Sequence, residues 1–270
     1  MTDGSPDADR RRFLDERRVI CERRMDTLHA PTYDERWGAY VNEAHGRCVQ
    51  ALIARLAPGS VVLDAACGTG KYWEMLLSAG LGIVGVDQSS RMLELASRKH
   101  PEVPVSHGSL QDLVARADLG SAMDALLCID AMENVGPEDW PGVVKGFAAV
   151  LRPGAPAYVT VELPEDDIVM DEDAVTAPLV AGEVLEGGAY HFYPSADQAR
   201  EWLTERASTS GTSWKATGTS TSCSDAAELR SGSTAISEGP ATPGAARARR
   251  GRRHLVARRT PPGAGRCRVT

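Results

Sequence analysis

The stretch VVLDAACGTGKYWEML, residues 61–76, decides how this chain folds. Its first five residues form a short apolar run that carries Asp64 near its end, as a buried strand does. Gly68 and Gly70 follow, and residues 70–79 have a helical pattern that Gly80 ends. A strand, a glycine turn and a helix in this order predict a loop that brings the backbone close to a ligand at the edge of an α/β sheet.

The same alternation of apolar strand and helix continues along the chain. Continuous apolar strands that alternate with helices favour a parallel sheet covered on both faces. The predicted fold class is therefore α/β, a Rossmann-like, doubly wound and mostly parallel sheet with N-terminal helices. The expected strands are 61–65, 82–87, 103–108, 124–130 and 157–163, and the expected helices of this part are 70–79, 89–100, 137–151 and 195–207.

The sequence divides into four parts. The last one is polar and rich in Ser, Thr, Gly and Arg, too poor in apolar residues to offset the entropy of ordering. It is expected to be disordered or the product of a shifted reading frame, which makes the final antiparallel hairpin of the sheet doubtful. The predicted parts are a disordered N-terminus (1–9), an N-terminal helical lid (10–57, with helices over 10–29 and about 33–56), a binding domain (58–206, with an excursion on the acceptor side at 164–194) and a low-complexity basic tail (207–270).

Charge and cysteine content limit the partners. The net charge is −7 and residues 207–270 carry +8, which leaves −15 for residues 1–206. An acidic body makes nucleic acid unlikely as a partner, except through the basic tail. No apolar run approaches the roughly 18 residues of a membrane span, and no cysteine or histidine cluster has metal-ligand spacing. Cys67 and Cys128 lie in apolar stretches that suit a reducing compartment, so we expect a cytoplasmic protein that binds no metal and no membrane.

The glycine turn can be compared with three loop chemistries. A phosphate loop needs the spacing GxxxxGK[ST], which Gly68 and Lys71 do not provide. A dinucleotide loop needs GxGxxG, and Trp73 stands at the third glycine position, where it would obstruct close helix–strand packing. Asp64 precedes the glycines and would repel a pyrophosphate. These features favour a ligand with a positive or amine-bearing end.

A second acid completes the expected site. Asp87 closes the strand 82–87, where a carboxylate can accept both hydrogen bonds of a ribose diol. The two acids together predict a nucleoside with a cationic, amino-acid-like tail. S-adenosylmethionine (SAM) has this chemistry and is the predicted cofactor.

The quoted motifs resemble a known family. VLDAACGTGKYWEMLLSAGLGIVGVDQSSRMLELASRKHP is similar to the first half of class I SAM-dependent methyltransferases, those of the methyltransferase-11/25 type that act on small molecules. GSLQDL, MDALLCIDAMENV and FAAVLRPGAPAYVTVEL resemble later parts of the same family, so the likeness covers roughly residues 33–206. It implies transfer of a methyl group from SAM to an O or N atom of a small-molecule acceptor. The alternative is a SAM-binding protein without catalytic activity, or one with a regulatory role.

The resemblance also implies roles for individual residues. Asp64 and the backbone of 66–70 would hold the methionine end, Asp87 would bind the ribose, and a loop that begins at Ser109 would touch adenine. The candidate cofactor-binding residues are Tyr33, Tyr40, Asp64, Ala66, Cys67, Gly68, Gly70, Asp87, Gln88, Ser109, Leu110, Gln111 and Cys128.

A general base is needed only if the acceptor must lose a proton. The candidates are Glu133, which follows the strand 124–130, and His191, in the aromatic run YHFYP. Each has a structural alternative: Glu133 as an acid that stabilises a helix N-terminus, and His191 as a packing residue. His45 and His107 are interpreted as structural.

Overall fold

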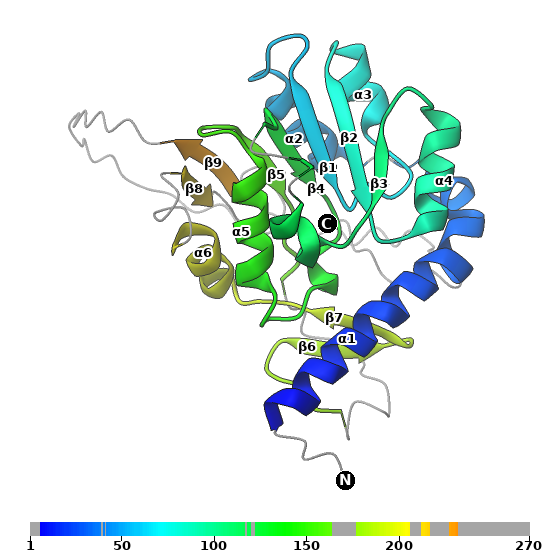
Figure 1. Cartoon of the computed structure of the whole chain (residues 1–270), viewed down its shortest axis with the longest axis vertical. Helices are drawn as coiled ribbons and strands as arrows, with labels where there is room; N and C mark the ends of the chain where they lie inside the picture. The colour runs from blue at the N-terminus through cyan, green and yellow to red at the C-terminus, as the bar shows by residue number, and fades with distance from the viewer. Residues whose placement is uncertain are drawn as a thin grey trace, which may run out of the picture. The chain divides into compact units, whose positions relative to one another are not determined.

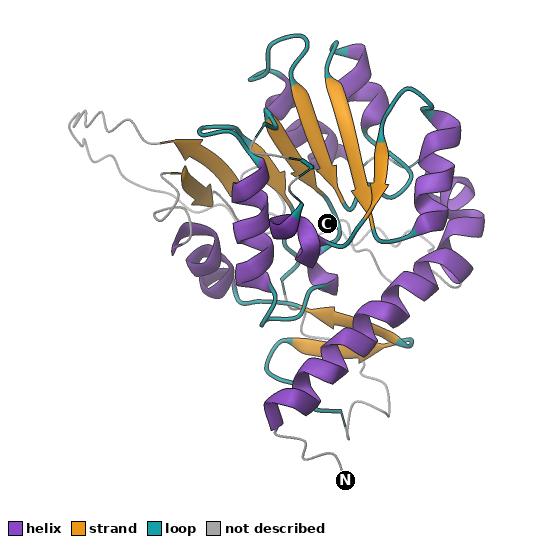
Figure 2. Ribbon diagram, viewed as in Figure 1, coloured by secondary structure: helices purple, strands orange, loops and turns teal. Residues whose placement is uncertain are grey.

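The computed structural model describes residues 6–38, 40, 42–116, 118–119, 122–163, 177–205, 212–216 and 227–231. Its centre is a five-stranded sheet in the order β3-β2-β1-β4-β5, and every pairing in it is parallel. Figure 2 shows the five strands side by side with helices around them. The predicted fold class is confirmed. The strands are β1 (Val61–Ala65), β2 (Gly82–Asp87), β3 (Val105–His107), β4 (Ala125–Cys128) and β5 (Ala157–Val159).

The strand order reverses at β1, and this reversal determines where on the sheet a ligand can bind. Leu63 of β1 lies opposite Val84 of β2 on one side and Leu126 of β4 on the other. The chain winds outward in both directions from this point, so the loops after β1 and β4 diverge. The resulting crevice at the carboxyl ends of the strands is where ligands bind in open α/β sheets.

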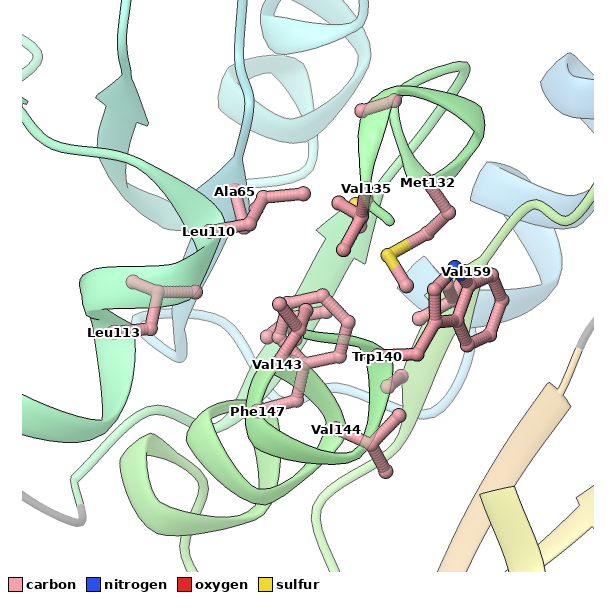
Figure 3. Close-up of a cluster of buried hydrophobic side chains, with 14 of the residues drawn as sticks. Ala65, Leu110, Leu113, Met132, Val135, Trp140, Val143, Val144, Phe147 and Val159 are labelled. Atoms are coloured by element: carbon pink, nitrogen blue, oxygen red, sulfur yellow. The ribbon is translucent and has the colours of Figure 1, made fainter. Parts of the chain in front are cut away.

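Helices cover both faces of the sheet, and the strands are apolar on both sides for this reason. In β4, Ala125 and Leu127 pack with α2, α3 and α4, whereas Leu126 and Cys128 pack with α5 and α6. Figure 3 shows the second of these cores, in which Trp140 and Phe147 of α5 lie under Val159 of β5. The helices are α2 (Glu43–Ile53), α3 (Trp73–Ser78), α4 (Ser90–Lys99), the 3₁₀ segment η4 (Leu110–Ala115), α5 (Trp140–Val150) and α6 (Ala196–Glu205).

The N-terminal segment begins with the long helix α1 (Pro6–Arg24). Three short turns follow, η1 (Met25–His29), η2 (Ala30–Thr32) and η3 (Asp34–Gly38), of which η1 and η3 are π-helical. The single helix predicted over about 33–56 is therefore wrong in its first part. Asn42 begins α2, because its side chain accepts the backbone N–H groups of Ala44 and His45 and so caps the helix there.

A β-hairpin that the sequence prediction did not include supports α1. The strands β6 (Glu183–Glu186) and β7 (Ala189–Phe192) are antiparallel and meet at Gly187 and Gly188, whose φ angles are +56° and +74°. Two positive φ angles are what a two-residue hairpin turn requires. α1 runs across this hairpin (Figure 1), and the ring of Phe13 meets Tyr190 edge-on at 6.1 Å.

A second antiparallel pair forms a two-stranded sheet of its own, so no hairpin among the described residues extends the five-stranded sheet. β8 (Thr212–Ala216) and β9 (Ala227–Ser231) pair with Trp214 opposite Leu229, and β9 lies beside β5. The rest of the predicted tail, and the acidic part of the excursion (164–176), lie outside the described residues. None of the helices that the structure describes is both long and apolar enough to cross a membrane.

Candidate functional site

A cavity of about 150 Å³ opens at the carboxyl ends of β1, β2 and β4. It receives side chains from α1, from the glycine loop, and from the loops after β2, β3 and β4. Ten of the thirteen predicted cofactor-binding residues line it, and the structure brings them together from separate stretches of sequence: Tyr33, Asp64, Ala66, Cys67, Gly68, Asp87, Gln88, Ser109, Leu110 and Gln111.

Three predicted residues do not line this cavity. Tyr40 is 38% exposed and its ring lies 5.1 Å from the Nζ atom of Lys71. Gly70 faces Trp73 in the interior instead. Cys128 is fully buried within β4. For these three the structure places no atom at the cavity wall, and their roles stay predictions.

The glycine loop is held in an unusual backbone conformation. Ala66 and Gly68 have φ angles of +61° and +53°, and a positive φ in alanine stores strain of the kind found at functional sites. The N–H of Cys67 donates to the carbonyl of Val86 at 3.0 Å, which ties the loop to β2. A Cβ atom added to Gly68 would meet nothing within 4 Å, so the backbone there faces open space. The loop thus presents bare backbone to a ligand.

Asp87 organises the junction of the glycine loop with β2. Its Oδ2 accepts the N–H of Gly68 at 2.8 Å, and its Oδ1 accepts the N–H of Ser89 at 2.7 Å. Burial raises the pKa of Asp87, and these two backbone hydrogen bonds oppose the rise. A carboxylate offers about four lone-pair positions, so two remain for a ligand diol. Asp87 is thus able to hold the loop and a ribose together.

Asp64 lines the same cavity from β1, the strand that pairs with β2. Its Oδ2 accepts a hydrogen bond from Nε1 of Trp73 at 2.7 Å. Burial, and to a smaller extent the charge of Asp87, raises the pKa of Asp64 to about 7, although the Trp73 hydrogen bond lowers it. Trp73 does not obstruct the packing of α3 as the sequence suggested, because the strand beside it carries glycine at position 85.

The first helix contributes residues that the sequence prediction missed. Arg18, Cys21 and Met25 reach the cavity from α1 and η1. The Sγ atom of Cys21 accepts a hydrogen bond from Nε2 of Gln88 at 3.4 Å, which links the helix to the ribose end of the site. Cys21 and Met25 are four residues apart, a spacing that places two side chains on one helix face. This spacing in the sequence predicts a helix, but it does not show on which part of the protein the helix packs.

Asp130 marks the far end of the cavity. It follows β4, lines the cavity and has a φ angle of +52°. Its N–H donates to Oγ1 of Thr160 at 2.7 Å, and its Oδ1 lies 3.8 Å from Nε2 of His45. His45 stacks on the ring of Tyr72, which also lines the cavity. Burial lowers the pKa of His45, and the charge of Lys71 adds to this, while Asp130 opposes it. Asp130 and His45 were not among the predicted catalytic residues.

The two predicted bases lie elsewhere. Neither Glu133, in the 3₁₀ turn η5 (Met132–Asn134), nor His191, in β7, is among the described residues that line this cavity. Both residues are half-buried, and the buried atoms Oε2 of Glu133 and Nδ1 of His191 have no hydrogen-bond partner among the described residues. Burial raises the pKa of Glu133, with help from the charge of Glu162, and lowers that of His191. η5 and β7, which carry these two residues, are in contact with each other.

The fold is an open, doubly wound α/β domain whose cavity lies at the carboxyl ends of the strands. Residues 62–154 match the family of methyltransferase domains, so the resemblance predicted from the glycine loop is confirmed for this segment. A solved structure of the magnesium protoporphyrin IX methyltransferase of Synechocystis, to which this chain is similar at 19% identity, holds bound SAM.

Two curated relatives show the range of the likeness. The chain is 34% identical over 137 residues to a dTDP-4-amino-2,3,4,6-tetradeoxy-D-glucose N,N-dimethyltransferase of Saccharopolyspora spinosa, covering 48% of this chain and 53% of that protein. It is 27% identical over 117 residues to a magnesium-protoporphyrin O-methyltransferase of Synechocystis, covering 41% and 50%. The chain therefore spans about half the length of these curated relatives.

The fold extends further than the sequence match. The solved structure of the magnesium protoporphyrin IX methyltransferase of Synechocystis with bound S-adenosylhomocysteine aligns with a TM-score of 0.56 at 18% identity. The alignment covers 79% of this chain and 97% of that one. At this identity the likeness shows a shared fold.

The residues present fit SAM. The open space over Gly68 leaves room for a ligand against bare backbone. Asp64 and Asp87 place two carboxylates in the same cavity, and carboxylates accept hydrogen bonds from groups such as an ammonium or a diol. Ser109, Leu110 and Gln111 add a third wall at the predicted adenine end.

Proposed function

We propose that this chain transfers a methyl group from SAM to a nitrogen or oxygen atom of a small-molecule acceptor. The observation that carries the proposal is a single cavity with Asp64 and Asp87 at the cofactor end and Asp130 at the end of β4. When bound, SAM supplies an electrophilic methyl group on a sulfonium. The protein's own contribution is to orient both molecules and to exclude water.

The cofactor residues act through charge and shape. Asp64 pairs with the ammonium group of the methionine end, and Asp87 accepts hydrogen bonds from the ribose hydroxyls. Other residues complete the wall, in keeping with their place around the cavity: Tyr33, Ala66, Cys67, Gly68, Gln88, Ser109, Leu110 and Gln111.

The N-terminal segment, residues 10–57, acts as a lid over this site. Three contacts support that role. The Oγ of Ser89 donates to Oδ1 of Asp26 at 2.5 Å, and the Oγ1 of Thr69 donates to Oδ1 of Asp34 at 2.8 Å. The third is the hydrogen bond that joins α1 to the residue after β2. Two π-helical turns lie within this segment, and such turns are frequent at functional sites.

Asp130 is the residue proposed to meet the acceptor. Its carboxylate is about half-exposed and lies near the imidazole of His45. An acidic group at this place accepts a hydrogen bond from an N–H or O–H of the acceptor and so turns a lone pair toward the methyl group. It also accepts the proton that the nitrogen or oxygen loses after transfer. Glu133 and His191, which do not line the cavity, remain candidate bases.

The test is an acceptor screen with radiolabelled SAM and the full chain. The panel contains a dTDP-linked amino sugar and a magnesium porphyrin, because the curated relatives are named for these acceptors, together with simple amines and phenols. We expect labelled product from at least one class. SAM binding by calorimetry with no product from any class would favour the alternative, a SAM-binding protein without catalytic activity.

We also propose a cytoplasmic location and no nucleic-acid or membrane partner. The thiols of Cys67 and Cys128 are free and buried, which fits a reducing compartment, whereas Cys48 takes part in a disulfide bond. The acidic charge of residues 1–206 disfavours nucleic acid as a partner.

A further inference from the structure

A buried tryptophan holds the acid at the cofactor's amine end. Trp73 is the first residue of α3, and its side chain is fully buried. Its Nε1–H donates to Oδ2 of Asp64 at 2.7 Å, and Asp64 is itself only 6% exposed. The other oxygen, Oδ1, has no donor among the described residues, and Asp64 lines the cavity. One oxygen is therefore fixed and the other is left for a ligand.

Two glycines make the space for this indole. A Cβ atom added to Gly70 would lie 2.5 Å from the Cδ2 atom of Trp73, and one added to Gly85 would lie 2.7 Å from its Cζ2 atom. The edge of the ring also meets His100, with ring centroids 5.6 Å apart. Glycine in the middle of a strand weakens the strand and often marks a close approach of another group. Here that group is the indole, which the two glycines restrict to one orientation.

The charges that act on Asp64 do not keep it ionised. Asp87 lies on the neighbouring strand and its charge raises the pKa of Asp64. The thiols of Cys67 and Cys128 lie in the two cores on either side of the sheet, and burial raises the pKa of both, so they stay neutral. With burial as the main cause, the pKa of Asp64 reaches about 7, so Asp64 changes charge near neutral pH. Two basic side chains line the same cavity without contributing to this shift: Arg18 and Lys71.

We propose that Trp73 is a positioning residue for the cofactor, that its indole N–H holds Asp64 with Oδ1 toward the cavity, and that Asp64 releases its proton to solvent as SAM binds. The inference rests on the proposed function, since it assumes that the ammonium group of SAM meets Asp64. An ammonium ion stabilises the carboxylate over the carboxylic acid. Cofactor affinity is then linked to pH through this one group.

The first experiment needs no cofactor. In a ¹⁵N-labelled sample of the full chain, the indole N–H of Trp73 reports the charge of the carboxylate that it contacts. We expect the cross-peak of this N–H to shift with pH, with a midpoint near pH 7, about the pKa that burial gives Asp64. In Asp64→Asn the cross-peak is expected not to shift with pH. Trp73→Phe identifies the peak by its disappearance. No shift between about pH 5.5 and pH 8.5, or the same shift in Asp64→Asn, would overturn the proposal.

The second experiment is SAM titration by calorimetry across the same pH range. The affinity of the wild type is expected to fall as the pH drops below about 7, toward tenfold per pH unit, with proton release on binding. Trp73→Phe removes one hydrogen bond to a charged group and is expected to bind about 10- to 100-fold more weakly. It is also expected to shift the midpoint of the pH profile upward, because the hydrogen bond that lowers the pKa of Asp64 is lost.

Trp140→Phe is the matched control. Trp140 is also fully buried, but it lies in the other core, and its Nε1 has no hydrogen-bond partner among the described residues. It is expected to lose similar stability and to keep wild-type affinity and midpoint. Equal affinity and midpoint in Trp73→Phe and wild type would overturn the positioning role while SAM binding stands. Absence of SAM binding by the wild type would instead defeat the proposed function, and the NMR titration would still decide whether Trp73 and Asp64 form the titrating pair.

Discussion

Replacing Asp64 with asparagine is expected to change how the stability of the ligand-free protein depends on pH. Burial holds the pKa of Asp64 at about 7, against an ordinary value of 3.8. An acid whose pKa is raised on folding stabilises the folded state at low pH, and this contribution is lost as the pH rises through the folded-state pKa. Asp64 therefore favours the folded protein below about pH 4 and costs stability above about pH 7. The asparagine side chain of the variant cannot titrate, so the substitution removes this dependence.

The magnitude follows from the two pKa values. At 1.36 kcal/mol per pKa unit, the whole difference corresponds to about 4 kcal/mol. Between about pH 5.5 and pH 8, the contribution of Asp64 to the free energy of unfolding changes by about 2 kcal/mol. Glu133 and Asp87 also have raised pKa values, so the stability of the wild type alone is not diagnostic. The difference between wild type and variant isolates Asp64.

The assay is urea unfolding of both proteins, followed by circular dichroism at the two pH values. We expect the free energy of unfolding of the wild type to fall by about 2 kcal/mol relative to that of Asp64→Asn as the pH rises. A wild-type-minus-variant difference that stays constant within about 0.5 kcal/mol would refute the reasoning. A difference that changes in the opposite direction would contradict it as well, because the pKa of Asp64 would then be lowered on folding.

Three further substitutions test other parts of the account. Gly85→Ala forces a Cβ to within 2.7 Å of Trp73 and is expected to lower the free energy of unfolding by about 1–3 kcal/mol. The control is Gly142→Ala, on an open face of α5. It should be neutral or stabilising in the same denaturation assay. Asp130→Asn is expected to lower kcat/KM by about tenfold or more for any acceptor that the screen finds, while the affinity for SAM stays unchanged. Weaker SAM binding by this variant would show that Asp130 contacts the cofactor instead of the acceptor. Glu183→Gln weakens the buried contacts of Glu183 with Arg10 and Tyr190 and is expected to cost about 2 kcal/mol, measured by thermal unfolding. An unchanged midpoint would show that these contacts do not help to hold α1.

The parts of the fold that depend on local pattern could be predicted from the sequence. Short apolar runs and a glycine turn placed β1 and β2 and their connecting helix α3, because each carries its own signal within a few residues. The roles of Asp64 and Asp87 followed from their positions relative to the strands. Topology then brought the two acids to one cavity without any further information.

Features that depend on packing between distant segments could not be predicted in this way. α1 was expected, but nothing in its pattern shows that Cys21 reaches Gln88. The role of Gly85 becomes apparent only when Trp73 is seen against it. The hairpin β6–β7 is a different case, because the sequence EVLEGGAYHF has a Gly–Gly turn between strand-forming residues, and this signal was available.

The predicted catalytic residues failed to reach the cavity for a related reason. The sequence indicates Glu133 and His191 only through their residue type and their place, after a strand for Glu133 and in an aromatic run for His191. Asp130 lies only three positions before Glu133, but its positive φ angle turns it toward the cavity. A backbone conformation of this kind leaves no mark in the residue pattern, since aspartate is tolerated there without being required.

The most direct test of the central claim is calorimetric titration of SAM into the wild type and Asp87→Ala. The account predicts saturable one-to-one binding by the wild type and a loss of affinity of about 100-fold or more in the variant, with the thermal unfolding of both proteins recorded as a control for folding. No binding by the wild type, or the same affinity in a folded Asp87→Ala variant, would contradict it.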